Sequence, residues 1–286
     1  MRRLLTAAFA FLLTAMPALA APETITVSAG EAKREFILHA PAPSSEPSPV
    51  VLVFHGGGAS AEWMANRSAD LTRTLTRAGY AVVYINGSTK RRTDKLRTWN
   101  AVHCCAYAAK SKINEAAYAD AVIDALGARL GIDRTRIFLM GHSNGAMRSY
   151  RLAGQIKTAP RAIAPVSGAI FADQPSLPAR TSVFMYHAVD DEVLSYDGNP
   201  DDKAERWRTA PHVGFLKAET KLAEMKGCAA AVASPATPGV TITARTCAGA
   251  SSLTAITALS GGHEWPARPA AYDIEDALLT FFDSQR

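Results

Sequence analysis

The sequence predicts an α/β fold with a mostly parallel central sheet that is flanked by helices on both faces. Short, continuous apolar runs recur along the chain, as at residues 50–54 and 81–85, and such runs are typical of strands buried on both faces. Longer stretches with apolar residues at helical spacing separate them, and two of these end at Gly79 and Gly131. This alternation favours a parallel sheet that is covered on both sides.

The elements follow one another in a simple order. The expected strands are residues 25–27, 35–39, 50–54, 81–85, 136–140, 162–166, 182–186, 240–244 and 253–259. The expected helices are residues 62–78, 113–130, 146–156, 211–226 and 271–282. Residues 86–112 are expected to form a long irregular segment, and such segments are usually functional or cross-linked. No repeat is visible, so residues 21–286 are interpreted as a single domain.

Residues 1–20 are typical of a secretory signal peptide. Arg2 and Arg3 supply a positive start, residues 4–16 are apolar, and residues 18–20 read Ala-Leu-Ala, a small-residue cleavage site. The apolar stretch is shorter than the roughly 20 residues that a membrane span needs. We therefore expect cleavage before Ala21, residence in the periplasm or outside the cell, and no membrane anchor.

Charge and cysteine content exclude some partners and suggest cross-links. The formal net charge is only +5 and basic runs are short, so nothing indicates a nucleic-acid partner. An even number of cysteines in an oxidising compartment favours disulfides, whose connectivity the sequence leaves open. Cys228 and Cys247 flank an Ala/Pro-rich stretch that a disulfide would hold together. Cys104 and Cys105 either form a vicinal disulfide or bond elsewhere, and their spacing does not match a zinc site.

Residues 141–145 read GHSNG and match the G-x-S-x-G pattern of a nucleophile elbow. They follow a strand-like run and precede a helix, which is the context that the motif requires. A sharp turn from strand to helix projects the Ser143 hydroxyl above the sheet, near the positive end of the helix dipole. Ser143 is therefore the candidate nucleophile, and the motif narrows the prediction to the α/β-hydrolase fold.

A serine nucleophile needs a base, and the base needs an orienting carboxylate. In this fold the acid and then the histidine follow the serine along the chain. His263 is flanked by glycine, follows the last expected strand and precedes the last expected helix, so it is the candidate base. His187 closes a strand and is interpreted as structural, and His212 is interpreted as a surface residue. Spacing alone fits both Asp190 and Asp191 as the acid.

Backbone N–H groups must stabilise the developing oxyanion. Asn144, directly after the nucleophile, supplies one candidate donor. Residues 55–58 read HGGG after a buried strand, as in the second donor loop of lipases and esterases. Gly57 is the expected donor there, with Gly58 as the alternative. The candidate substrate-binding residues are His55, Trp99 and Trp265. A packing role is equally open for the two tryptophans, and for His55 the alternative is that it braces its loop by hydrogen bonding.

Combined in this order, the motifs resemble the family of secreted polyhydroxybutyrate depolymerase-like and feruloyl esterase-like enzymes. The resemblance spans nearly all of the chain after the signal peptide, and its segments are residues 55–57, 98–100, 104–105, 141–145, 150–153, 187–191, 196–198, 228–247 and 262–266. It implies hydrolysis of carboxylic esters by a triad of Ser143, His263 and Asp191, so that Asp191 is preferred to Asp190.

The expected function is thus a serine esterase that acts on short-chain hydroxyalkanoate oligoesters and needs no metal or organic cofactor. Feruloyl or acetyl esters of plant polysaccharides are the alternative substrates, and a non-catalytic binding protein on the same scaffold is the alternative of another class. Ala146 and Ala188 stand where this family commonly has glycine, and both could reshape the pocket. The oligomeric state stays open.

Overall fold

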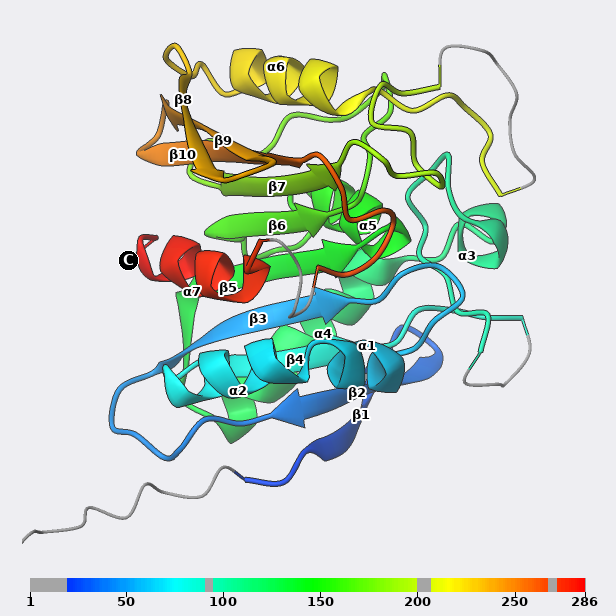
Figure 1. Cartoon of the computed structure of the whole chain (residues 1–286). Coiled ribbons are helices and arrows are strands. Elements are labelled where there is room, and N and C mark those ends of the chain that lie inside the picture. Colours follow the sequence, from blue (N-terminus) through cyan, green and yellow to red (C-terminus); the bar gives the residue numbers. More distant parts are fainter. Residues whose placement is uncertain (1–19, 91–94, 200–206, 267–271, 286) are drawn as a thin grey trace, which may run out of the picture.

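The computed structural model describes residues 20–90, 95–199, 207–266 and 272–285. Its strands form one ten-stranded sheet in the order β1-β2-β4-β3-β5-β6-β7-β10-β9-β8 (Figure 1). The strands are β1 (Glu23–Ala29), β2 (Ala32–His39), β3 (Ser48–Phe54), β4 (Ala81–Ile85), β5 (Ile132–His142), β6 (Ala162–Val166), β7 (Ser182–Ala188), β8 (Val232–Thr237), β9 (Val240–Cys247) and β10 (Ser251–Ala258). The helices are α1 (Ala61–Arg67), α2 (Ala69–Arg77), α3 (Ala106–Lys110), α4 (Glu115–Arg129), α5 (Asn144–Leu152), α6 (Phe215–Met225) and α7 (Ile274–Asp283).

The middle of the sheet is parallel and its edges are antiparallel. Strands β4, β3, β5, β6, β7 and β10 run in the same direction. The β1–β2 hairpin closes one edge, and β9 and β8 close the other with antiparallel pairing. The prediction of a mostly parallel sheet is therefore confirmed.

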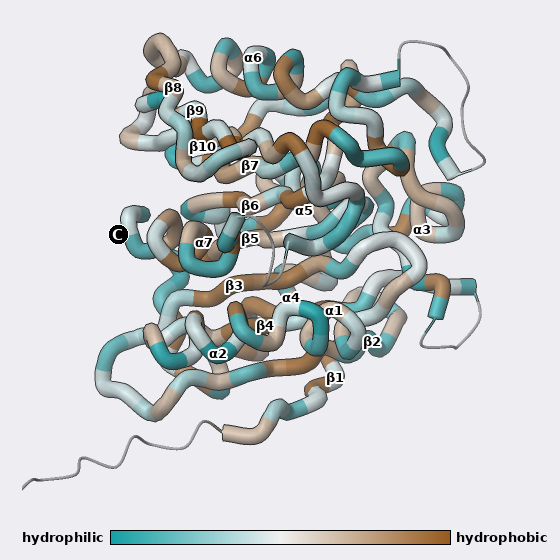
Figure 2. The backbone as a smooth tube through the Cα atoms, in the orientation of Figure 1, coloured by the Kyte–Doolittle hydropathy of each residue, from teal (hydrophilic) through white to brown (hydrophobic). Residues whose placement is uncertain are grey.

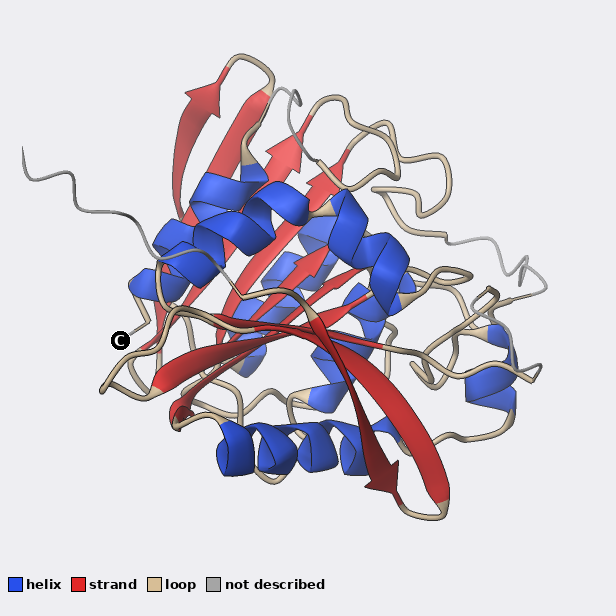
Figure 3. Cartoon of the chain, turned by 90° about the horizontal axis from the view of Figure 1, so that it is seen from below, coloured by secondary structure: helices blue, strands red, loops and turns tan. Residues whose placement is uncertain are grey.

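Alternating side chains of the buried strands feed two separate cores. In β3, Val50, Leu52 and Phe54 belong to the cluster that packs under α4, α5 and α6, whereas Val51 and Val53 belong to the cluster under α1, α2 and α7. Figure 3 shows the helices on the two sides of the twisted sheet. A strand with apolar residues at every position is stable only where both faces are covered. The predicted placement of helices on both faces is thus confirmed as well.

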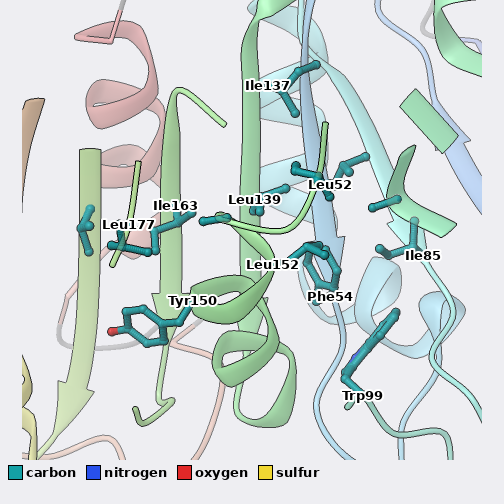
Figure 4. Close-up of a cluster of buried hydrophobic side chains, with 14 of the residues drawn as sticks. Leu52, Phe54, Ile85, Trp99, Ile137, Leu139, Tyr150, Leu152, Ile163 and Leu177 are labelled. Carbon is teal, nitrogen blue, oxygen red and sulfur yellow. The ribbon is translucent and has the colours of Figure 1, made fainter. Parts of the chain in front are cut away.

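The first of these cores lies directly beneath the nucleophile helix. Figure 4 shows Leu52 and Phe54 of β3 beside Ile137 and Leu139 of β5, with Leu152 of α5 in the same cluster. Figure 2 shows the same concentration of apolar residues along the central strands. Because protein interiors are packed at close to crystal density, this core holds the start of α5 at a fixed height above the sheet.

Three local expectations differ from the structure. The helix expected at residues 62–78 is divided at Ser68, whose buried hydroxyl donates to Met64 O and also bonds with the Tyr84 hydroxyl. Strand β8 was not expected, because its Pro235 opposes strand formation, yet proline is tolerated at a sheet edge. The irregular segment 86–112 contains the short helix α3.

The carboxyl ends of the parallel strands all lie at one edge of the sheet. Figure 1 shows the arrowheads of β3, β6 and β7 pointing towards the side where α3 lies. In open α/β sheets, functional residues gather outside this edge. Within the described residues, no helix combines the length and the apolar character that a membrane crossing requires.

Candidate active site

Ser143 occupies a tight turn between β5 and α5. Its backbone has φ 54° and ψ −120°, a left-handed conformation that non-glycine residues seldom adopt. A Cβ atom at Gly145 would collide with the Phe54 carbonyl, and one at Gly141 would collide with the backbone of Gly145. Both positions therefore require glycine if the turn is to lie so close to β3. The Ser143 N–H donates to Val166 O (3.0 Å), which fixes the turn to β6.

Three side chains from different strand ends meet in one hydrogen-bonded line. His263 Nε2 lies 2.7 Å from Ser143 Oγ, and His263 Nδ1 lies 2.8 Å from Asp191 Oδ2. The Asp191 side chain is fully buried, and the His263 side chain is 17% exposed. An ionised carboxylate only accepts hydrogen bonds, so His263 Nδ1 carries the proton and Nε2 is free to accept from the serine hydroxyl.

The two adjacent aspartates have different surroundings. Asp191 Oδ1 accepts the N–H groups of Val193 (2.9 Å) and Leu194 (2.8 Å), while Oδ2 faces the imidazole of His263. Asp190 is exposed, and its Oδ1 accepts the Gly262 N–H (2.8 Å). Asp191 therefore contacts the candidate base, and Asp190 braces the loop that carries it.

Hydrogen bonding keeps Asp191 ionised. Burial opposes its negative charge, but the hydrogen bonds from His187, from His263 and from the Leu194 N–H outweigh that cost and hold the pKa of Asp191 far below its usual value. The carboxylate is thus charged throughout the neutral range, as an orienting group for an imidazole must be.

Two candidate oxyanion donors lie near the nucleophile: the backbone N–H of Gly57 in the glycine loop and that of Asn144 at the start of α5. Gly57 lies against Asn144, because a Cβ atom at Gly57 would be 3.5 Å from Asn144 Cβ. Asn144 is the first residue of α5, where the backbone N–H has no partner within the helix. The N–H of Gly58 donates to Arg97 O (2.8 Å) and is already used. Of the two glycines, Gly57 is therefore the better placed to receive an oxyanion.

The Asn144 side chain has a task that the sequence did not reveal. Its Oδ1 accepts the Trp99 N–H (2.8 Å), and its Nδ2 donates to Trp99 O (3.2 Å) and to Cys104 Sγ (3.6 Å). It therefore clamps Trp99 and Cys104 to the start of α5. No local sequence signal marks this contact, since it joins residues that are 45 positions apart.

The cysteines form two disulfides of different kinds. Cys104 bonds to its neighbour Cys105, and Cys228 bonds to Cys247. The vicinal pair was one of the alternatives that the sequence left open. Both members of the vicinal pair line the cavity above Ser143, whereas the second disulfide lies beside α6 and β9, away from that cavity.

The three expected substrate-binding residues lie behind the site instead of in it. His55 is fully buried, with Nδ1–H donating to Gly56 O (2.7 Å) and Nε2 accepting the Gly87 N–H (2.9 Å). The indole N–H of the buried Trp99 donates to His55 O (2.8 Å). Trp265 is packed in the core under α7. None of the three lines the cavity, so the structure supports the packing role that was left open for them.

A cavity of about 880 Å³ opens above the nucleophile. Other tryptophans line it: Trp63 of α1, which is 44% exposed, and Trp207. Trp63 lies off the apolar face of α1, whose buried residues are Ala61 and Met64, so helical spacing could have identified it as a surface residue. The remaining lining residues used below are Met147, Val193, Cys104 and Cys105.

Two further histidines support the loops of the site. His142 Nε2–H donates to His263 O (3.1 Å), and burial together with the nearby His263 lowers the pKa of His142 to about 3. His142 is therefore neutral beside the candidate base. The interpretation of His212 as a surface residue is wrong, because it is only 6% exposed and its Nε2 bonds to Ser195 O (3.0 Å). Among the described residues, no group of three or more His, Cys, Asp or Glu side chains is arranged to hold a metal ion.

The chain is similar to known esterases in sequence and in fold. Residues 35–210 match the family model "Esterase PHB depolymerase". A relative from Nocardia uniformis subsp. tsuyamanensis, named "Putative esterase NocK", is 30% identical over 88% of this chain and 77% of its own length. The "Bifunctional acetylxylan esterase/xylanase XynS20E" of Neocallimastix patriciarum is 26% identical over 58% of this chain, which spans only 22% of that protein.

Solved structures share the fold at low sequence identity. The acetyl xylan esterase from Aspergillus awamori has a TM-score of 0.65 at 14% identity and covers 92% of this chain and 99% of its own. A carboxylesterase from Bacillus cereus has a TM-score of 0.55 at 13% identity, covering 88% of this chain and 94% of its own. With the family match over most of the sheet, the chain belongs to the PHB depolymerase esterase family and is a carboxylic ester hydrolase of the α/β-hydrolase fold.

Proposed function

We propose that the chain hydrolyses esters through a triad of Ser143, His263 and Asp191, with a covalent acyl-enzyme intermediate. The observation that carries the proposal is the unbroken hydrogen-bonded line from Ser143 Oγ through His263 to Asp191. A nucleophile in contact with a base that a third group orients is the signature of an activated serine.

In the first half-reaction, His263 Nε2 takes the hydroxyl proton as Ser143 Oγ attacks the ester carbonyl. The oxyanion of the tetrahedral intermediate accepts hydrogen bonds from the backbone N–H groups of Asn144 and Gly57. His263 then passes its proton to the departing alcohol, and the acyl group stays on Ser143.

In the second half-reaction, His263 removes a proton from water as the water oxygen attacks the acyl carbonyl. His263 then returns this proton to Ser143 Oγ as the bond between the acyl group and Oγ breaks, and the acid leaves. Asp191 holds the Nδ1–H tautomer of His263 and stabilises its protonated form in both halves. The low pKa of Asp191 supports this role, because the carboxylate stays charged while the imidazole gains and loses its proton.

We propose short-chain hydroxyalkanoate oligoesters as the substrate class. The match to the PHB depolymerase esterase family supports this class. So does the cavity, which at about 880 Å³ is far larger than a single acetyl group and has Met147, Val193 and Trp207 in its wall.

Acetyl or feruloyl esters of plant polysaccharides are the second candidate class. One relative, named a bifunctional acetylxylan esterase/xylanase, and one structural neighbour, an acetyl xylan esterase, favour it. Trp63 and Trp207 favour it too, because flat aromatic side chains at a cavity mouth suit stacking against sugar or phenyl rings.

We further propose that residues 1–20 are a signal peptide and that residues 21–286 form one exported catalytic domain. Residues 1–19 lie outside the described part of the chain, so this rests on the sequence pattern at Arg2, Arg3 and residues 18–20. That every described strand joins one sheet supports the single domain. Amino-terminal sequencing of exported protein should begin at Ala21, and a retained Met1 would contradict the proposal.

The nucleophile is tested by Ser143→Ala. Turnover of a short-chain p-nitrophenyl ester should fall by about 10⁵- to 10⁶-fold, as in other serine hydrolases that lose the nucleophile. Ser149→Ala is the matched control: Ser149 is buried in the same helix, and its hydroxyl donates to Ala146 O of that helix (2.8 Å), so activity should persist. A wild-type protein that a fluorophosphonate probe does not label would favour the non-catalytic alternative.

The identity of the triad carboxylate is tested by substituting each of the two adjacent aspartates, Asp190 and Asp191. Asp191→Asn should lower kcat by about 10⁴-fold, because the amide favours the wrong tautomer of the base. Asp190→Asn keeps the triad contacts and should lose less than about tenfold, from the weaker bond to the Gly262 N–H. A crippled Asp190→Asn with an active Asp191→Asn would reverse the assignment.

The substrate class is tested with a panel that sets hydroxybutyrate oligomers beside methyl ferulate and acetylated xylan. The proposal expects the highest kcat/KM for the hydroxybutyrate oligomers. A preference for either polysaccharide-type ester would move the protein to the second class.

A further inference from the structure

Two imidazoles contact the same oxygen atom of Asp191. His263 Nδ1 lies 2.8 Å from Asp191 Oδ2, and His187 Nε2 lies 3.1 Å from that same atom. The other carboxylate oxygen is taken by the N–H groups of Val193 and Leu194. His187 closes β7 and is only 2% exposed, so it reaches Asp191 from inside the fold, on the side away from the cavity.

The partners of His187 determine where its proton lies. Its Nε2 is also 2.8 Å from Leu194 O, which can only accept a hydrogen bond. Nε2 therefore carries the hydrogen and shares it between Leu194 O and Asp191 Oδ2. The opposite nitrogen, Nδ1, is buried and has no hydrogen-bond partner among the described residues.

The surroundings of His187 are mostly apolar. The rings of Tyr196 and Phe215 pack against it, with centroids 6.0 Å and 5.6 Å away. A second proton on Nδ1 would place a charge in this apolar pocket without a partner. The other titratable or charged groups around the assembly are His142 beside His263, the Arg67–Glu264 ion pair, Asp190 on the same turn, and His212 and Arg208 behind His187.

We propose that His187 is a positioning residue of the triad, which shares Asp191 Oδ2 with His263 and thereby limits how strongly this carboxylate holds the protonated base. The inference rests on the proposed function, since it concerns the same base. It goes beyond the triad because it assigns a task to a fourth side chain that touches neither substrate nor the reacting atoms.

The expected sign follows from the hydrogen bonds. A donated N–H from His187 disperses part of the carboxylate charge, and this agrees with the low pKa of Asp191, to which the His187 hydrogen bond contributes. Without it, Oδ2 offers more charge to His263 Nδ1–H, and the protonated base becomes more stable. A higher pH is then needed to free the base, so the acid limb of kcat/KM moves upward.

The test compares three variants. His187→Leu removes the donor. His187→Gln can place an amide N–H near the position of Nε2. Tyr196→Phe is the structural control, because it keeps the ring that packs on His187 and removes only the bond between the Tyr196 hydroxyl and Thr257 Oγ1 (2.7 Å). The readout is kcat/KM for a p-nitrophenyl ester against pH, with thermal unfolding measured in parallel.

His187→Leu should move the acid limb upward by roughly half a pH unit to one unit. One hydrogen bond to a charged group is worth about 1–2 units at that group itself, and only part of this effect reaches His263 through Asp191. His187→Gln should restore most of the wild-type pH profile. Tyr196→Phe should leave the pH of the acid limb unchanged, even if this variant is less stable than the wild type. An acid limb that stays unchanged in His187→Leu would overturn the inference. A wild-type protein without esterase turnover would instead overturn the proposed function.

A measurement on the wild type keeps the inference testable if His187→Leu does not fold. In nitrogen NMR of histidine-labelled protein, the hydrogen of His187 should lie on Nε2, which faces Leu194 O and Asp191 Oδ2. A His187 ring that carries its hydrogen on Nδ1 alone would contradict the inference.

Discussion

The two disulfides lie in regions that depend on different forces. The pair at Cys104 and Cys105 is buried in the cavity wall, where Cys104 Sγ accepts a hydrogen bond from Asn144 beside the nucleophile. The bond between Cys228 and Cys247 ties the segment after α6 to the end of β9, where both cysteines are only half-buried. The first region is ordered by polar contacts around a functional turn, and the second has little core of its own. We therefore expect the first disulfide to matter for rate and the second for stability.

The largest effect is expected from removing the bond between Cys228 and Cys247. Closing a loop of 19 residues stabilises a fold by about 3 kcal/mol in the chain-entropy model, so the double serine variant should lose about that much free energy of unfolding. Denaturant unfolding measures it. Below the transition, kcat/KM should stay within about twofold of wild type, because these residues do not line the cavity.

The next effect is expected from Cys104→Ser with Cys105→Ser. A shift of about 1 Å in a catalytic site can cost about 10²-fold, so loosening the wall behind Asn144 should lower kcat/KM by roughly tenfold to a hundredfold. Ester turnover at saturating and limiting substrate measures it. If this variant instead loses stability and keeps full activity, the division of labour between the two disulfides is wrong.

The smallest effect is the loss of stability around His55 that we expect when the pH is lowered. Burial lowers the pKa of His55 from 6.5 to about 4, so between these values the unfolded chain binds more protons than the folded one. Stability around His55 should be complete above pH 6.5 and should have declined by about 2 kcal/mol when the pH reaches 5. Hydrogen exchange should then accelerate at the Trp99 indole N–H and the Gly87 N–H, which bond to His55, before it accelerates in β9. If protection is lost at the same pH around His55 and in β9, the prediction that acid acts first around His55 is wrong.

Much of the fold was accessible from the sequence because its signals are local. The apolar runs of β3 and β4 and the glycines around Ser143 report burial and backbone conformation at the positions where they stand. The candidate triad residues were accessible for a related reason: a parallel sheet places the ends of its strands at one edge, whatever the lengths of the connections.

What the sequence could not reveal depends on contacts between distant segments. The clamp from Asn144 to Trp99 and the shared oxygen between His187 and His263 join residues that no local pattern connects. The tryptophans illustrate the same limit. Trp99 and Trp265 suggested a substrate pocket, but both are buried, and Trp63 and Trp207 take that place.

Asn144 links two properties that protein engineers usually try to vary independently. Its main chain faces the reacting carbonyl in the proposed mechanism, while its amide group holds the segment of residues 95–106, which supplies part of the cavity wall. Libraries that randomise this segment to change substrate preference will therefore also perturb turnover of every substrate. Screens should score the two outcomes separately, and anchoring positions such as Trp99 are best left unvaried.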